Sequence, residues 1–333
     1  MKKTRLVLWA LDHKLNLLEV QDKLLKDYTQ PIDDLLQYQV PLEDRSLNHH
    51  WKVYDKTFRL SQIHNVQVEY ILAQGILDYQ TVPKKLWFDR EGRLMPKNSL
   101  VTRKEIDTLF FEMKGRVYAV LAIPEYLEPK IRANLFNMEY DWGRIDYKEL
   151  PQFRFDYNFF NWLLSKKGKE IKDSYGNSLL VIDVEGFSGE TARGASVITG
   201  TGGNIASQPV TKTMISMASS FNELEITLEY KDMRINFKMD YISKCNFNDE
   251  NSFKTSGSSK LINVYEAIIS IYYEIIPLFN SVYHKEIRDG TFRLEYDVFQ
   301  KQAGLNVIED IARQLDLSLK EISELQYFKD GYE

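Results

Sequence analysis

The sequence predicts an α+β fold, in which antiparallel strands and helices are grouped along the chain. Two observations carry this prediction. Apolar runs joined by glycine-containing turns are typical of β-hairpins, and the apolar segment 260–283 is typical of a long buried helix. A length of 333 residues with 44% hydrophobic residues suffices for two cores. We expect a mixed α/β domain over 1–150 and an α+β domain over 151–333 that ends in a helical pair.

The N-terminal unit is predicted to combine strands, two helices and two hairpins. In order, these are a strand over 4–12, a helix over 15–38 bent or broken at Pro31, a polar stretch over 42–56, a segment compatible with helix or strand over 60–77, hairpins with turns at 91–92 and 114–115, and a helix over 124–136. The bend is placed at Pro31 because proline lacks the backbone N–H that a helix interior needs. Glycine at the second turn position predicts both hairpins.

The second unit is predicted to contain a hairpin between helices. In order, we expect a helix over 156–165, a strand over 179–184, a polar loop over 185–212 with a short helix over 212–220, a hairpin over 224–241, a mobile polar loop over 246–259, a helix over 260–283, one more strand within 288–299, and two short helices within 305–328. Alternation of apolar and polar residues supports the strands, and the apolar spacing supports the helices.

The hairpin over 224–241 has the best specified register. A two-residue turn at Lys231-Asp232 places apolar residues opposite one another on one face and opposite charges on the other. The expected pairs are Leu228 with Ile235, Ile226 with Phe237, Leu224 with Met239, Glu229 with Arg234, and Glu225 with Lys238. A slip by one residue would break both patterns at once, so the register is well determined.

Charge and cysteine content indicate where in the cell the protein is located and which classes of partner it can bind. Cys245 is the only cysteine, which excludes an intrachain disulfide framework and predicts a reducing, cytoplasmic location. The start of the chain lacks the pattern of an export signal, and Glu266, Glu274 and Pro277 interrupt the most apolar segment, so we expect no membrane contact. The net charge of −5 gives no general basic bias, which leaves nucleic-acid binding only as a local option.

The glycine-rich run 185–212 raises the question of a nucleotide. Residues 189–196 resemble the phosphate-binding Walker A pattern, but Ala195 stands where the pattern needs the lysine that reaches the phosphates. The residues that follow are also a poor helix start. We therefore expect no bound cofactor, and interpret the run as a loop that contacts a partner. Its candidate contact residues are Gly189, Arg193, Gly194, Gly202 and Gly203.

A short motif in the first unit offers an enzymatic alternative. Asp107, followed by Glu112-x-Lys114, resembles the D…E-x-K core of restriction-type nucleases. There, two carboxylates hold Mg²⁺ or Mn²⁺ and the lysine steadies the attacking water. The same triplet recurs at 170–172 and 229–231, and Lys114 is equally explained by a hairpin turn. An ordinary hairpin is the preferred interpretation.

The C-terminal segment 311–325 offers a second alternative, because it resembles a helix-turn-helix. Asp316 occupies the turn position, where it can adopt the left-handed conformation. Arg313, Ser318 and Lys320 are the candidate contacts to nucleic acid or to a protein. Glutamates on the second helix oppose phosphate binding, so a plain helical pair is preferred.

These observations together predict a non-enzymatic role. No motif forms a complete catalytic set, whereas polar loops and an acidic helical tail favour contact with another macromolecule. We expect one subunit of a bacterial multi-protein system with a protein partner, and its oligomeric state is left open. The abundance of Lys, Asn, Ile and Tyr resembles the composition of mobile-element and anti-phage defence proteins of AT-rich bacteria, which adds antiviral defence as a hypothesis.

Overall fold

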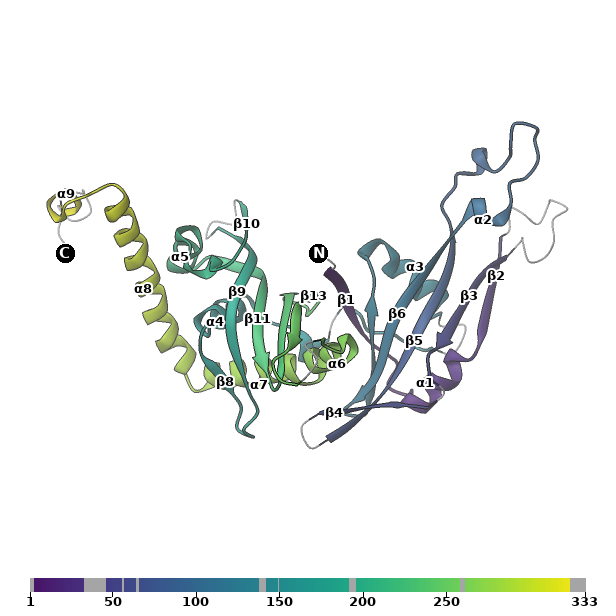
Figure 1. The fold of residues 1–333 in the computed structure, drawn as a ribbon, viewed down its shortest axis with the longest axis horizontal. Helices are drawn as coiled ribbons and strands as arrows, with labels where there is room; N and C mark the ends of the chain where they lie inside the picture. The colour runs from purple at the N-terminus through teal and green to yellow at the C-terminus, as the bar shows by residue number, and fades with distance from the viewer. Residues whose placement is uncertain are drawn as a thin grey trace.

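The computed structural model describes most of the chain. The described residues are 3–32, 46–55, 57–63, 66–137, 142–148, 150–191, 196–257 and 261–323. Together they form an antiparallel sheet with helices on both of its faces, which confirms the predicted α+β fold (Figure 1).

Strands dominate the first half of the chain. In order, its elements are β1 (Lys3–Ala10), α1 (Leu17–Leu24), β2 (Asp27–Pro31), β3 (Ser46–Val53), β4 (Arg59–Ile63), β5 (Val66–Gln80), η3 (Lys84–Leu86), α2 (Lys97–Leu100), β6 (Val101–Met113), β7 (Arg116–Ala122), η4 (Glu125–Leu127) and α3 (Glu128–Asn134).

The second half combines strands with longer helices. In order, its elements are η6 (Pro151–Phe153), α4 (Tyr157–Ser165), β8 (Glu170–Lys172), β9 (Ser178–Glu190), β10 (Val197–Thr201), η7 (Ile205–Ser207), α5 (Pro209–Ser216), β11 (Ser220–Tyr230), β12 (Met233–Asp240), β13 (Cys245–Lys254), α6 (Val264–Ile269), the π-helical segment η8 (Ser270–Ile275), α7 (Ile276–Arg288), α8 (Thr291–Gln314) and α9 (Leu319–Ser323).

The first strand joins the two halves into one sheet. The strand order is β10-β9-β11-β12-β13-β1-β7-β6-β5-β3-β2, with β4 beside β5 and β8 beside β9. β1 pairs with β13 on one side and with β7 on the other, both antiparallel. The sheet therefore continues across residue 150, and the division into two domains at that residue stays a prediction.

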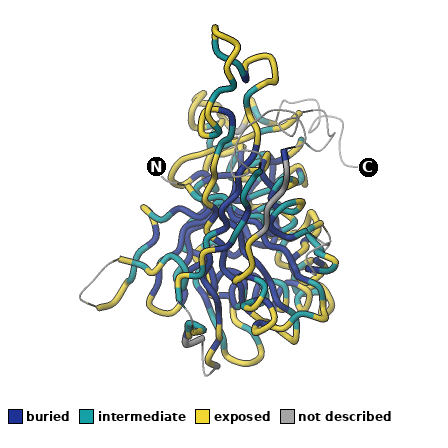
Figure 2. Tube along the Cα trace, turned by 90° about the vertical axis from the view of Figure 1, so that its right-hand side faces the viewer, coloured by how far each residue is buried: buried dark blue, intermediate teal, exposed yellow. Residues whose placement is uncertain are grey.

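Two cores lie on opposite faces of this sheet, because successive residues of a strand point to opposite sides. Leu6 and Leu8 of β1 belong to the larger core, which continues over β9 and β11–β13 beneath α4 to α7. Val7 and Trp9 of the same strand belong to the smaller core with α1 and α3. Figure 2 shows the buried positions along the strands in the interior. The helices thus cover opposite faces of the sheet in the two halves.

The hairpin predicted over 224–241 is confirmed in register. β11 and β12 pair Leu228 with Ile235 and Leu224 with Met239, and the other expected pairs also face one another. Arg234 forms an ion pair with Glu229. Glu225, however, binds Lys3 of β1 at 2.7 Å, because the continuation of the sheet brings a second lysine to it.

The hairpin turn at Lys114-Gly115 is confirmed as well. Both residues have positive φ, 54° and 74°, the combination that a two-residue turn of type I′ requires. Around Glu91-Gly92 only the bridge between Phe88 and Leu94 forms. The helices expected over 124–136 and 156–165 are present as η4–α3 and α4, and the one over 212–220 as α5.

The helix predicted over 15–38 is wrong beyond Leu24. Asn16 caps α1 through a reciprocal pair of bonds with Glu19, and the chain then enters β2, the last strand of the sheet order on that side. Pairing with β3 thus overrides the helical pattern, and Pro31 ends the strand, as proline can at a sheet edge. Residues 33–38 lie outside the described residues. The ambiguous segment 60–77 belongs to β4 and β5.

Two further expectations fail in the second half. The supposed mobile loop 246–259 contains β13, which is held on both sides by β12 and β1. Two of its polar residues, Asn248 and Ser252, are buried: the Asn236 backbone N–H donates to Ser252 Oγ, which itself donates to the Asn248 carbonyl. The strand expected within 288–299 is instead the start of α8, which follows Gly290 at a φ of 79°.

Candidate functional site

Helix α8 forms one edge of the molecule. It runs for 24 residues after the turn at Gly290, and α9 follows it near the C-terminus (Figure 1). α8 packs on α5, α7 and α4, which themselves lie on or beside the sheet. Only one side of α8 therefore faces the body of the protein.

The inner face of α8 holds the helix in place. Ala303 is buried, and Phe292 and Phe299 pack against the larger core. Gln300 Nε2 donates to the Ile215 carbonyl at 3.1 Å, and Asp310 pairs with Lys212 of α5 at 3.0 Å. At about 100° of rotation per residue, these positions all lie on one side of the helix.

The opposite side of α8 is also apolar, but it is exposed. We call this surface the outer face of α8; it consists of Leu294, Val298, Lys301, Leu305, Ile308, Ala312 and the helix-capping Leu315. Its large apolar side chains have exposed fractions of 72% for Leu294, 70% for Val298, 50% for Leu305, 52% for Ile308 and 64% for Leu315. At about 100° of rotation per residue, the outer face lies opposite Ala303.

The spacing of the outer face is that of a coiled-coil seam. Its members alternate by four and three residues, which gives Leu294, Lys301, Ile308 and Leu315 the d positions of a heptad and Val298, Leu305 and Ala312 the a positions. Side chains at these positions pack between those of a neighbouring helix. Scattered exposed apolar residues are ordinary on protein surfaces, but a contiguous row marks an interaction site.

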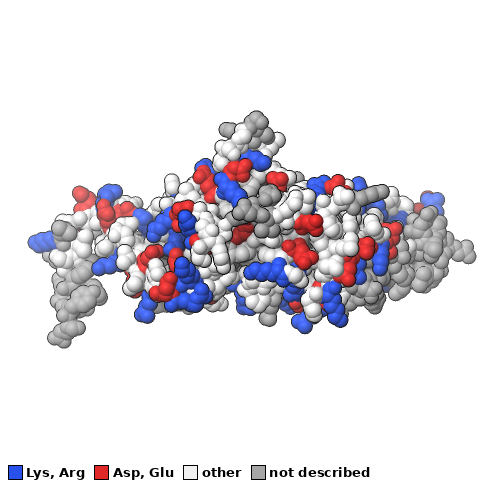
Figure 3. Space-filling model, turned by 90° about the horizontal axis from the view of Figure 1, so that it is seen from below, with Lys and Arg blue, Asp and Glu red and all other residues white. Residues whose placement is uncertain are grey.

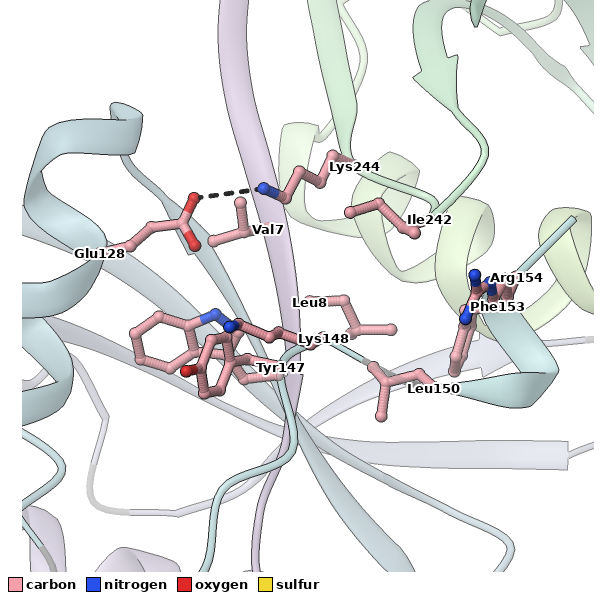
Figure 4. A pocket seen from close by; sticks show the side chains of 11 residues that line it. Val7, Leu8, Glu128, Tyr147, Lys148, Leu150, Phe153, Arg154, Ile242 and Lys244 are labelled. Carbon is pink, nitrogen blue, oxygen red and sulfur yellow. Dashed lines mark ion pairs between the residues drawn. The ribbon is translucent and has the colours of Figure 1, made fainter. Parts of the chain in front are cut away.

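A small cavity at the junction of the two halves is structural rather than ligand-binding. It has a volume of about 10 Å³, room for about one water molecule. Glu128 of α3 accepts from Arg5 of β1 at 2.6 Å. It also forms an ion pair with Lys244 at 3.6 Å, which Figure 4 shows. Since these residues come from both halves, the cluster ties the halves together.

A larger cavity of about 390 Å³ lies beside the π-helical segment η8. The buried Glu274 lines it and accepts from Lys231 Nζ at 3.0 and 3.2 Å. Burial, and then Glu274, raise the pKa of the Tyr230 hydroxyl. Glu274 is therefore already paired with a lysine, and the other charged residues that line the cavity are Lys114 and Asp173.

The structure does not bring the nuclease-like residues together. Asp107 and Glu112 are five positions apart in β6, so their side chains lie on opposite faces of the sheet and about 16 Å apart along the strand. Asp107 accepts from the Tyr54 hydroxyl at 3.0 Å, while Lys114 occupies the hairpin turn. Among the described residues, no group of three His, Cys, Asp or Glu side chains is placed to hold a metal ion.

Most of the described part of the glycine-rich run is regular structure, so the expectation of a loop over 185–212 is wrong. β9 extends to Glu190 and pairs with β10, and a helical turn and α5 follow. A Cβ atom at Gly189 would lie 2.6 Å from the Ser220 carbonyl oxygen, so close strand packing explains this glycine. Gly202 and Gly203 follow β10, whereas Arg193 and Gly194 lie outside the described residues.

Two of the three candidate contacts of the C-terminal pair, Arg313 and Ser318, have partners within that pair. Arg313 binds Glu309 at 2.6 Å within α8. Ser318 caps α9: its backbone N–H donates to Glu321 Oε2 at 2.8 Å, and these bonds lower the pKa of the Glu321 carboxyl. Lys320 is exposed. Asp316 has a φ of 53°, as predicted, but the first helix is long rather than short.

The surface charge in Figure 3 does not indicate a second binding site. Acidic and basic side chains are interspersed over the face in Figure 3. No described helix is long and apolar enough to cross a membrane.

No protein-family model matches the sequence, and no curated protein matches it significantly. Because the sequence predicts a strand at the start of α8, it does not predict the outer face, although the four–three spacing is visible in the sequence.

Proposed function

We propose that this chain is a non-enzymatic, protein-binding subunit of a bacterial multi-protein system, and that the outer face of α8 is its contact surface. The single observation that carries the proposal is the exposed apolar row from Leu294 to Leu315 at coiled-coil spacing. A cytoplasmic location is part of the same proposal. An association with anti-phage defence or mobile elements rests on amino-acid composition alone.

Physical reasoning supports a protein partner for this face. Each large aliphatic side chain contributes about 1.5–3 kcal/mol when it is fully removed from water. Exposure of the row to water is therefore unfavourable, and its burial against another helix would contribute this free energy to binding. Since α8 is already held by its inner face, the outer face adds little to folding and is available for docking.

The two alternatives receive less support from the geometry. A D…E-x-K nuclease needs its two carboxylates on one side of the strand, and Asp107 and Glu112 project to opposite sides. A DNA reader needs free basic groups on its second helix, yet Glu321 accompanies Lys320 there. Both alternatives stay predictions from the sequence.

A position-specific crosslink tests the proposal. A photoreactive amino acid is placed at Leu305 and, as a control, at Tyr175, which is exposed elsewhere. The chain is then expressed in the organism that encodes it. We expect a discrete protein adduct from position 305 alone, identified by mass spectrometry. The identified protein, once purified, should bind the wild-type chain and lose at least about tenfold in affinity for Leu305→Asp/Ile308→Asp.

The control variant Tyr175→Asp should keep the wild-type affinity. Equal affinity of the purified partner for the wild type and for Leu305→Asp/Ile308→Asp would show that the outer face is not the contact surface. If the crosslinkers at positions 305 and 175 react with the same proteins, the outer face is likewise not a specific contact surface.

A further inference from the structure

We infer that the partner supplies an amphipathic helix whose apolar row is flanked by lysine or arginine residues, and that this helix pairs with α8 as a two-stranded coiled coil. The inference rests on the proposed function and adds the chemistry of the partner to it. It is carried by the charges beside the apolar row.

The positions that flank the row are acidic or neutral. In a coiled coil, the e and g positions border the seam and select the partner by charge. In α8, all of whose residues are described, these positions are Glu295, Asp297, Gln302, Gly304, Glu309 and Ile311. Asp297 lies on one flank of the row, and Glu295 and Glu309 lie on the other. No basic residue occupies either flank of this helix.

These acids are exposed to a docking partner. Glu309 is 64% exposed and is bonded to Arg313, which lies on the same side of the helix one turn further on. Glu295 is 42% exposed, although Lys166 holds it at 3.1 Å. Asp297 is exposed as well. A helix that docks on the row therefore meets Asp297 on one edge and Glu295 and Glu309 on the other, the latter two partly neutralised by Lys166 and Arg313. Carboxylates at these positions favour lysine and arginine on the partner.

A second copy of the chain fits this surface poorly. In an antiparallel pair, the e positions of the two copies face each other, as do the g positions, so acids would oppose acids. In a parallel pair in register, Lys301 would face Lys301 of the other copy within the apolar seam. Like charges in contact cost binding free energy in both arrangements.

A lipid surface fits poorly for a related reason. Amphipathic helices that lie on membranes carry lysine and arginine beside the apolar face, because bilayer surfaces are negatively charged. The flanks of α8 carry the opposite sign. The outer face therefore matches a basic helix better than a membrane.

Lys301 supplies a further feature of the partner. A single charged residue inside an apolar seam costs affinity but fixes the register of the two helices. We expect an acidic or amide side chain of the partner opposite Lys301. This one position would distinguish the correct alignment from alignments shifted by a heptad.

Two synthetic helices test the inference on the intact chain. Both peptides have four heptads with the same Leu/Val row and one Asn placed to face Lys301; one has lysine and the other glutamate at every e and g position. Fluorescence anisotropy measures their binding. We expect the lysine peptide to bind at least about tenfold more tightly at low salt, and the difference to shrink in 0.5 M salt, roughly as screening predicts.

Variants connect this preference to the proposed residues. Leu305→Asp/Ile308→Asp should abolish binding of both peptides. Asp297→Lys/Glu309→Lys should reverse the preference in favour of the glutamate peptide. The charge-matched control Glu105→Lys/Glu112→Lys, on exposed positions of β6, should keep the wild-type preference.

The outcomes separate the inference from the proposed function. Equal binding of the two peptides, or tighter binding of the glutamate peptide, overturns the basic partner but leaves a helix-binding face. Dimerisation in analytical ultracentrifugation that Leu305→Asp/Ile308→Asp abolishes makes a second copy the occupant and also overturns the inference alone. Binding of neither peptide by a monomeric chain, or binding to anionic vesicles through Leu305 and Ile308, overturns both.

Discussion

The two long helical segments of the second half use their apolar residues in opposite ways. The segment α6–η8–α7 lies against the sheet, and Ile271, Tyr272 and Phe279 in it are fully buried. In α8, by contrast, only Ala303 belongs to the fully buried core, and the apolar row on the outer face is exposed. The apolar content of a helix therefore does not by itself show whether the helix stabilises the fold or contacts a partner. The first segment stabilises the fold, and α8 presents a surface.

The largest expected effect is on the free energy of unfolding, which should fall for a substitution in α7 but hardly change for one on the outer face of α8. Phe279 packs edge-on against Phe159 and Trp162, with ring centroids 6.0 and 6.2 Å away. Phe279→Ala should lower the free energy of unfolding by about 3–5 kcal/mol because it leaves a cavity. Leu305→Ala on α8 should change it by no more than about 0.5 kcal/mol. Urea denaturation followed by tryptophan fluorescence measures both.

A large loss of stability in Leu305→Ala would contradict the claim that the outer face of α8 contributes little to folding. It would mean that the outer face of α8 is part of the folded core, and the surface could then not serve a partner. An equally small loss in both variants would place Phe279 outside the core.

A smaller effect on stability is expected at His49, a buried polar residue near the other end of the sheet. His49 of β3 is buried, and among the described residues neither of its ring nitrogens has a hydrogen-bond partner. Burial lowers the pKa of His49 from 6.5 to about 4, while the nearby Asp78 carboxylate partly opposes this shift. The folded protein therefore keeps His49 neutral at a pH where the unfolded chain binds a proton.

The sign of the pH effect follows from this difference. Stability from His49 is complete above pH 6.5 and is lost as the pH falls from 6.5 towards 4. Between pH 7.5 and pH 5, the wild type should lose about 2 kcal/mol through this residue. His49→Leu should remove that part of the pH dependence. The same pH dependence in both proteins, measured by urea denaturation, would show that His49 is not buried neutral.

The sequence predicts the fold best where neighbouring signals agree. In the hairpin of β11 and β12, the apolar pairs and the charged pairs both require one register, and that register forms. The prediction fails where burial depends on distant partners. β13 is predicted as a polar loop because its sequence is polar, whereas its pairing with β12 and β1 buries Asn248 and Ser252, and Ser252 Oγ donates to the Asn248 carbonyl.

The candidate site illustrates the same limit. The four–three spacing of Leu294, Val298 and Leu305 can be read from the sequence, but α8 has a second apolar face at Phe292 and Phe299. Which face turns inward depends on α5, through contacts such as Lys212 with Asp310. Sequence periodicity alone does not decide between them.

Hydrogen exchange on the intact chain tests the central claim most directly, because it compares the two helical segments in one experiment. Amide exchange is followed by mass spectrometry with and without the lysine-flanked peptide. A docked helix should slow exchange in α8 about tenfold or more and leave α6–η8–α7 unchanged, since the latter is already buried. Protection of another segment, or unchanged exchange in α8 at saturating peptide, would contradict the claim that the outer face of α8 binds a partner.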